Sequence, residues 1–243
     1  MYSSAHYLSL AVVLAVLWAG SGDSRELDGS EGRVMNSHAT RVSLPPPVTS
    51  GPLSVEEALQ RRRSIREYAE EEVTLRDAGQ LLWAAQGITE RASGLRTAPS
   101  AGALYPLELR LLAARVTGLP AGIYRYDPHA HALQTELSGD LREGVAEAAL
   151  GQEAIRRAPA VLLLSGVVGR TEAKYGSRAE RYVMMEAGHA SENVYLQATA
   201  LGLGTVAIGA FSTVGVHAVL QLPSEEQLLY IMPVGYPRRA NNE

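Results

Sequence analysis

The sequence contains no cysteine among its 243 residues. This absence excludes thiolate zinc sites, iron–sulfur clusters, a cysteine nucleophile and structural disulfides. The sequence also lacks a Gly-x-Gly-x-x-Gly fingerprint and a Walker motif, so it does not indicate a Rossmann dinucleotide domain or a P-loop. The net charge is only −4 and the basic residues are dispersed apart from one run, so nucleic-acid binding is not indicated.

What is present is the composition of a soluble globular protein, with 46% apolar and 20% charged residues. A chain of this length can bury a core that needs no metal or disulfide to hold it together.

The N-terminus carries an uncharged apolar run from Leu8 to Gly20, which is the length of a signal-peptide core rather than of a membrane span. Small residues follow the run, but no lysine or arginine precedes it. We expect residues 1–22 to be a signal peptide or a membrane anchor, which would make the protein exported, periplasmic or membrane-attached. The alternatives are a buried helix, or a chain that starts at Met35 and stays in the cytoplasm.

Residues 23–52 have the composition of a linker. Glycine, serine and acidic residues dominate the first part, and three consecutive prolines at 45–47 stiffen the second part toward polyproline II. We therefore expect the globular domain to occupy residues 53–243.

Helix signals open this domain. Ser54-x-x-Glu57 is a capping box, which predicts a helix that runs to about Arg63. Thr74-x-x-Asp77 opens a second predicted helix, which ends at Gly87, and the Gly-, Ser- and Pro-rich stretch 91–106 is predicted to be a long loop.

The remainder mixes strands and helices, which predicts an α+β fold. The predicted strands are Leu107–Ala113, Ile123–Tyr126, Ala132–Thr135, Ala160–Val168, Thr205–Ile208 and Leu228–Val234. The length of the strand Ala160–Val168 (AVLLLSGVV) and its branched side chains predict that it is fully buried. The predicted helices are Asp140–Leu150, the long helix at 179–201, and a helix after Ser212.

The basic run Arg61-Arg62-Arg63-Ser64-Ile65-Arg66 lies where the first predicted helix ends. A charge run is most often a solvated helix face. A phosphate, however, needs converging cationic forks and a hydroxyl donor, and Arg-x-Ser-x-Arg supplies both.

Four ordered segments resemble the nitroreductase family and cover residues 54–239. They are Arg62-Arg63-Ser64-Ile65-Arg66-x-Tyr68, the stretch from Thr97 to Glu108 (TAPSAGALYPLE), Glu186-Ala187-Gly188-His189-Ala190 with Gly202-Leu203-Gly204-Thr205, and Pro233-Val234-Gly235-Tyr236-Pro237. The sequence is most similar to the SagB-type dehydrogenases, also called azoline oxidases.

The resemblance implies a mostly antiparallel central sheet flanked by helices, and a homodimer that binds FMN at the subunit interface. It implies that the phosphate, ribityl chain and pyrimidine edge are held by the first segment, through Arg62, Arg63, Ser64 and Arg66. Pro99, Ser100, Ala101 and Gly102 would approach from the partner chain. The stretch Ala207–Ala210, with Ile208 and Gly209, would line the ring and present backbone amides, and Arg238 or Arg239 would complete the phosphate site.

Lys174-Tyr175 follows the buried strand and precedes the long helix. Taken alone, such a pair is an exposed charge beside a packing aromatic. In the azoline-oxidising branch a Lys-Tyr pair stands at this position, which implies a general base that removes a carbon-bound proton as hydride leaves to FMN. A lysine acts as a base only where burial lowers its pKa toward neutrality.

We predict no metal site. Glu186-x-x-His189 has the spacing of a di-iron ligand pair but lacks the second pair that such sites need. His129-x-His131 lies in the predicted hairpin turn without further ligands.

Three functions follow as hypotheses. The first is an FMN-dependent dehydrogenase that oxidises a small-molecule or peptide-derived substrate. The second is an NAD(P)H-dependent reductase of nitroaromatics or quinones, and the third is a non-catalytic flavin-binding partner protein.

Overall fold

The computed structural model describes residues 40–238. The predictions for residues 1–22 and 23–39 lie outside this range. Within it, no helix is long and apolar enough to cross a membrane.

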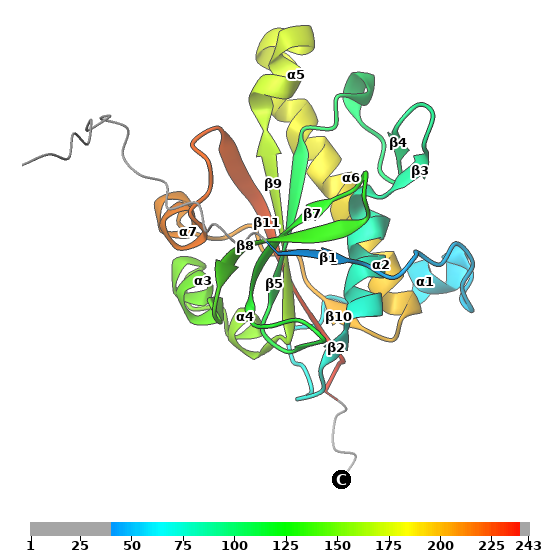
Figure 1. The fold of residues 1–243 in the computed structure, drawn as a ribbon, viewed down its shortest axis with the longest axis vertical. Coiled ribbons are helices and arrows are strands. Elements are labelled where there is room, and N and C mark those ends of the chain that lie inside the picture. Colours follow the sequence, from blue (N-terminus) through cyan, green and yellow to red (C-terminus); the bar gives the residue numbers. More distant parts are fainter. Residues whose placement is uncertain (1–39, 239–243) are drawn as a thin grey trace, which may run out of the picture. The chain divides into compact units, whose positions relative to one another are not determined.

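A seven-stranded antiparallel sheet forms the centre of the domain (Figure 1). In spatial order its strands are β1 (Arg41–Ser43), β8 (Ala132–Ser138), β7 (Gly122–Asp127), β5 (Leu107–Ala113), β9 (Ala160–Val167), β11 (Glu226–Gly235) and β10 (Gly204–Thr205). Each pair of neighbours is antiparallel. Two small two-stranded sheets join β2 (Val73–Thr74) to β6 (Val116–Thr117) and β3 (Ile88–Glu90) to β4 (Leu95–Arg96).

Seven α-helices occur within residues 40–238. They are α1 (Val55–Arg61), α2 (Leu75–Gln86), α3 (Arg142–Ala148), α4 (Glu153–Arg157), α5 (Val168–Tyr175), α6 (Ala179–Ala200) and α7 (Thr213–Leu220). The α+β class and the mostly antiparallel sheet with flanking helices are confirmed.

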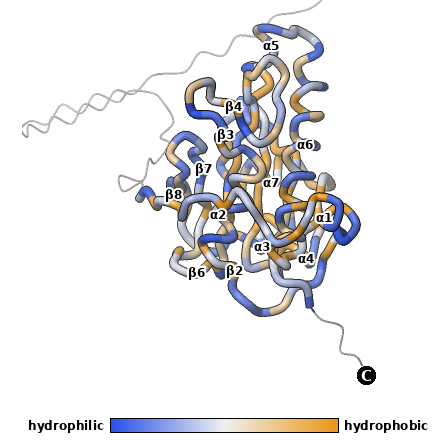
Figure 2. Tube along the Cα trace, turned by 90° about the vertical axis from the view of Figure 1, so that its right-hand side faces the viewer, coloured by the Kyte–Doolittle hydropathy of each residue, from blue (hydrophilic) through white to orange (hydrophobic). Residues whose placement is uncertain are grey.

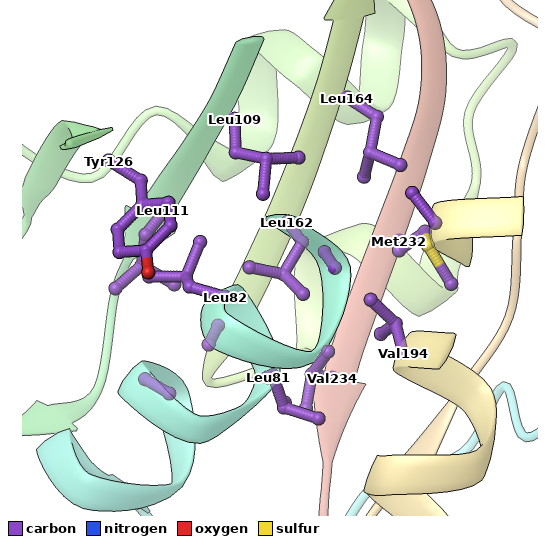
Figure 3. Close-up of a cluster of buried hydrophobic side chains, with 14 of the residues drawn as sticks. Leu81, Leu82, Leu109, Leu111, Tyr126, Leu162, Leu164, Val194, Met232 and Val234 are labelled. Atoms are coloured by element: carbon purple, nitrogen blue, oxygen red, sulfur yellow. The ribbon is translucent and has the colours of Figure 1, made fainter. Parts of the chain in front are cut away.

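The helices cover both faces of the sheet, and each face has its own core. On one face α2 and α6 pack on the strands, where Leu81, Leu82 and Val194 meet Leu162 and Leu164 (Figure 3). The other face lies under α3, α4 and α7. Burial on both sides explains why β9 is apolar except for Ser165, whose buried hydroxyl donates to Glu226, and the predicted buried strand is confirmed.

Hydrophobic residues fill the two cores, and hydrophilic residues lie on the outer parts of the chain (Figure 2). Figure 2 shows that the chain around α1 and the outer end of α5 is mainly hydrophilic. These two regions carry the basic segment and the Lys174-Tyr175 pair, whereas the candidate site residue Ile208 is part of the core under α3, α4 and α7.

The capping signals are confirmed in detail. The Ser54 hydroxyl accepts from the Glu57 amide at 3.2 Å and the Glu57 carboxylate accepts from the Ser54 amide at 3.3 Å. The Thr74 cap and the Gly87 end of α2 are as predicted. Helix α1 ends at Arg61 rather than Arg63, because the backbone turns to the extended conformation at Arg62.

The linker prediction is wrong for residues 41–48. Arg41–Ser43 adds an edge strand to β8, and Leu44 is buried against Gly79 of α2. The buried amide of Gln80 then bonds both the N–H and the C=O of Val48, at 2.8 and 2.9 Å. Prolines in this stretch indicated a free linker, but they also suit an extended segment that packs along a helix.

Three further boundaries differ from the prediction. The predicted loop 91–106 contains β4 and a 3₁₀ turn at Ala101–Ala103. The predicted strand Thr205–Ile208 is reduced to Gly204–Thr205, with Ile208 forming a separate bridge to Ile231. Helix α5 was not predicted, and it places Lys174 and Tyr175 in a helical turn.

Candidate functional site

The basic segment leaves α1 and runs beside β10. Ser64 pairs with Thr205 in a parallel bridge, and the Ile65 amide donates to the Thr205 carbonyl at 2.9 Å. Tyr68 anchors the segment because its ring is fully buried and its hydroxyl lies 2.7 Å from the carbonyl of Ile65 and 3.1 Å from that of Pro233. Burial raises the pKa of Tyr68, so the hydroxyl stays a donor.

A glycine makes this pairing possible. A Cβ atom at Gly204 would lie 2.6 Å from the Cβ of Ile65, closer than two carbon atoms can approach. The second glycine of the Gly-Leu-Gly-Thr motif therefore serves packing, because it lets the basic segment lie against β10.

The arginines of the segment differ in what they bond. The Arg63 Nη1 donates to the carbonyls of Gln60 and Arg62, at 3.0 and 2.7 Å, which caps the end of α1. The Arg62 guanidinium lies 5.2 Å from the centre of the Tyr195 ring. Among the described residues, neither Arg62 nor Arg66 has a carboxylate or carbonyl acceptor. The guanidinium N–H groups of both are therefore free to donate to a ligand.

Tyr195 of α6 connects this segment to the stretch Ala207–Ala210. Its hydroxyl bonds the Ser64 hydroxyl at 3.2 Å and accepts the Ala207 amide at 2.8 Å. Tyr195 could not be predicted as a site residue from the sequence, because one tyrosine on a long helix is most often a packing residue. Only the tertiary contacts reveal its part in the site.

The amides of this stretch are only partly available. Ala207 donates to Tyr195 and Ile208 donates to the Ile231 carbonyl at 2.9 Å, so neither can donate to a ligand. The amides of Gly209 and Ala210 have no acceptor within residues 40–238, and both residues are exposed. Of the backbone amides expected to face the flavin ring, only those of Gly209 and Ala210 are therefore free to donate.

The C-terminal end of the described chain returns to the same place. The Arg238 amide donates to the Glu67 carbonyl at 3.0 Å, and its guanidinium lies 4.0 Å from the Glu67 carboxylate. Arg238 thus lies beside the basic segment, while Arg239 lies outside the described residues. We call Arg62, Ser64, Arg66, Tyr195 and Arg238 the cationic half-site.

A second group forms around the loop at residues 99–105. The Ala101 amide donates to the buried Glu186 carboxylate at 2.9 Å, and the Tyr105 amide donates to the Ser100 hydroxyl at 2.9 Å. Gly102, Ala103 and Tyr105 have left-handed φ values of 65°, 55° and 47°. Left-handed backbone is costly for residues other than glycine and gathers at functional sites.

Lys174 and Tyr175 face this loop. A Cβ atom at Gly102 would lie 2.8 Å from the Lys174 Nζ and 3.0 Å from the Tyr175 hydroxyl. Tyr175 is held edge-to-face by Tyr182, with ring centres 5.0 Å apart, whereas Lys174 is exposed on the single chain. We call the loop with Lys174, Tyr175 and Glu186 the loop half-site.

The two half-sites lie on opposite sides of α6. Glu186 holds the loop half-site and Tyr195 belongs to the cationic half-site. They are separated by two and a half helical turns, which is about 13 Å of rise and a half-turn of rotation. The structure therefore brings the predicted residues into two groups that contact α6 on opposite sides within one chain.

The buried Glu186 carboxylate gives the loop half-site a pH dependence. Burial raises the pKa of Glu186 above its usual 4.5, so the folded chain binds this proton more tightly than the unfolded chain. The contribution to the free energy of unfolding is therefore largest at low pH and is lost as the pH rises through the folded pKa. We expect Glu186→Gln to be about neutral near pH 4 and increasingly more stable than the wild type as the pH rises.

Thermal unfolding followed from pH 4 to pH 8 checks this expectation. Glu192→Gln, on the exposed side of the same helix, controls for the loss of one negative charge. A stability difference between Glu186→Gln and the wild type that does not change with pH would contradict the assignment.

Within residues 40–238, no group of three or more His, Asp or Glu side chains is arranged to hold a metal ion. Glu186 instead bonds the Ala101 amide. His131 bonds the Tyr126 hydroxyl and the Pro45 carbonyl.

Comparison with known proteins places the chain in a family. The model of the "Nitroreductase family" matches residues 59–236. A protein of Methanocaldococcus jannaschii named "Putative nitroreductase MJ1384" is 43% identical over 183 residues, which cover 75% of this chain and 91% of that one.

Two solved structures, both described as "putative nitroreductase", share the fold. The one from Ralstonia eutropha has a TM-score of 0.73 and 29% identity, covering 82% of this chain and 90% of its own. The one from Anabaena variabilis has a TM-score of 0.73 and 32% identity, covering 88% of this chain but 45% of its own. From its sequence match and its fold, this chain belongs to the nitroreductase family of oxidoreductases.

Proposed function

We propose that the protein is an FMN-dependent dehydrogenase of the SagB type, which oxidises a small-molecule or peptide-derived substrate. The observation that carries this proposal is Lys174. It is the one lysine of the chain, every other cationic side chain being arginine, and it faces the flavin-loop residue Gly102 together with Tyr175.

The cationic half-site suits an FMN phosphate. Arg62 and Arg66 have unused donor forks, Ser64 adds a hydroxyl, and the buried Thr205 hydroxyl has no hydrogen-bond partner. Arginine forks and hydroxyl donors are the groups that bind phosphate oxygens. The isoalloxazine ring of an FMN whose phosphate is bound here could reach the free amides of Gly209 and Ala210.

The placement of the half-sites supports a homodimer. One chain directs them to opposite sides of α6, so a flavin that contacts both needs the loop half-site of a second subunit. Two exposed methionines on α6, Met184 and Met185, offer apolar surface for that contact, with 48% and 45% of their surface accessible.

A lysine suits proton removal because an arginine does not lose its proton in proteins. FMN, when bound, supplies the hydride acceptor for the oxidation. Lys174 would take the carbon-bound proton, and Tyr175 would orient the substrate beside it. Lys174 is exposed on the single chain, so the partner subunit and the substrate would have to provide the burial that a lysine base requires.

A second function is favoured by the name of the relative from Methanocaldococcus jannaschii. NAD(P)H-dependent reduction of a nitroaromatic or quinone would use the same flavin site and would leave Lys174 without a part in catalysis. A flavin-binding protein without catalysis is the third alternative.

The first experiment is purification of the full chain with its bound flavin. We expect a yellow protein that releases FMN on denaturation and is bleached anaerobically by its reduced substrate. Bleaching by NAD(P)H instead would favour the reductase.

Arg66→Ala should lower FMN affinity at least about tenfold. Arg63→Ala should retain the wild-type affinity, because the Arg63 side chain caps α1. Wild-type protein that binds no FMN would overturn all three functions.

We also propose that residues 1–22 direct export or membrane attachment. Determination of the mature N-terminus in the native organism tests this. An intact N-terminus on a protein in the soluble cytoplasmic fraction would contradict it.

A further inference from the structure

A cavity of about 280 Å³ opens where two strands of the main sheet separate. Strand β7 pairs with β5 only as far as Arg125 and Arg110, whereas β5 continues beside β9 to Leu107. The last residue of α2, Gln86, and Arg170 in the first turn of α5 also line the cavity. The polar side chains that line it include Gln86, Arg96, Glu108, Arg125 and Arg170.

The cavity has more positive charge than its own carboxylates neutralise. Glu108 is shared by two arginines, bonding the Arg125 Nε at 3.1 Å and also the Arg170 guanidinium. The other carboxylate of the lining, Asp127, bonds Arg41 from outside the cavity at 3.2 Å. Because Asp127 is paired with Arg41, Glu108 alone neutralises the three lining arginines, Arg96, Arg125 and Arg170, and two positive charges are left over.

Arg96 is the cation without a carboxylate. Its Nη1 bonds the neutral Gln86 side chain at 3.0 Å, its guanidinium stacks 4.5 Å from the centre of the Tyr105 ring, and its Nε is buried without an acceptor. Burial lowers the pKa of Arg96 because desolvation disfavours its charge. An anion in the cavity would offset that desolvation and satisfy the free N–H group.

Arg125 can contribute to the same anion. Its Nε is used by Glu108, but its two terminal nitrogens have no acceptor among residues 40–238. Arginine binds carboxylate and phosphate through paired parallel hydrogen bonds, so two terminal nitrogens at the mouth of a cationic cavity suit a group with two or more oxygens.

We propose that this cavity binds the oxyanionic group, carboxylate or phosphate, of a small acid. The cavity adjoins the loop half-site, because Arg170 donates to the Tyr105 carbonyl at 3.4 Å and lies one turn of α5 before Lys174. A substrate anchored here by its acidic group would extend toward Lys174. That the bound acid is the substrate rests on the proposed function, but the affinity of the cavity for an oxyanion does not.

Calorimetric titration of the flavin-loaded protein tests the proposal with three probes: benzoate, inorganic phosphate and the neutral benzamide. We expect benzoate or phosphate to bind and benzamide not to bind, and the stronger of the two anions identifies the source of the oxyanion. Arg125→Gln should weaken binding of that anion at least about tenfold, and Arg125→Lys, which keeps the charge but not the fork, should weaken it less. Arg156→Gln, which removes an equal charge from an exposed ion pair, should change nothing.

Equal anion affinity in the wild type and Arg125→Gln would overturn the proposal, as would benzamide binding as tightly as benzoate. Flavin content is measured in every sample. Loss of flavin from Arg125→Gln with unchanged anion affinity would assign Arg125 to the flavin site and also overturn the proposal. Anion binding by a wild-type protein that takes no FMN would leave this site standing while the proposed function failed.

Discussion

Lys174→Arg is expected to keep its flavin and to lose substrate oxidation by about a hundredfold or more, the usual effect of removing a general base. Arginine keeps the positive charge and nearly the length of lysine, but it cannot give up its proton. Oxidation of a peptide that contains a thiazoline ring, followed by the absorbance of the thiazole product, measures the effect.

The scarcity of lysine provides a matched control. Arg178→Lys, on the exposed turn after α5, introduces a lysine near the site but outside it. Combined with Lys174→Arg, it restores the number of lysines without restoring the position, and we expect the double variant to stay inactive. If Lys174→Arg oxidises the peptide as fast as the wild type, Lys174 has no part in the chemistry.

Mixing two flavin-deficient variants is expected to restore flavin binding to about a quarter of the wild-type level. Arg66→Ala damages the cationic half-site and Gly102→Val damages the loop half-site, because a β-branched residue is strained at φ +65° and its Cβ would meet Lys174. If each site combines the two half-sites of different subunits, a hybrid dimer contains one intact site and one doubly damaged site. Random association makes about half of the dimers hybrid.

The mixture is prepared by joint refolding or by co-expression with two affinity tags. Flavin binding is then measured at an FMN concentration at which neither variant alone binds FMN. Circular dichroism and thermal unfolding establish that both variants fold. A hybrid without flavin would contradict the shared site, because a site built within one chain cannot be restored by a partner. This readout needs no substrate, so it stays informative if the Lys174 prediction fails.

The sequence by itself was sufficient for features that depend on neighbouring residues. The capping box at Ser54, the Thr74 cap and the length of β9 all follow from local hydrogen bonding or from a run of apolar residues. Ordered motifs were likewise sufficient for the family and for the α+β fold. The linker prediction failed at β1, because composition does not reveal that the edge of β8 accepts another strand.

The assembly of the site was decided by the tertiary structure. Arg62, Arg63 and Arg66 are equivalent in the sequence, and only the turn after α1 uses one of them to cap a helix. Tyr195 carried no local signal, yet its hydroxyl joins Ser64 to Ala207. The physical reason is distance along the chain: Ser64 and Tyr195 are 131 positions apart, so their contact depends on how the sheet and α6 place them. The same long-range placement puts the two half-sites on opposite sides of one helix.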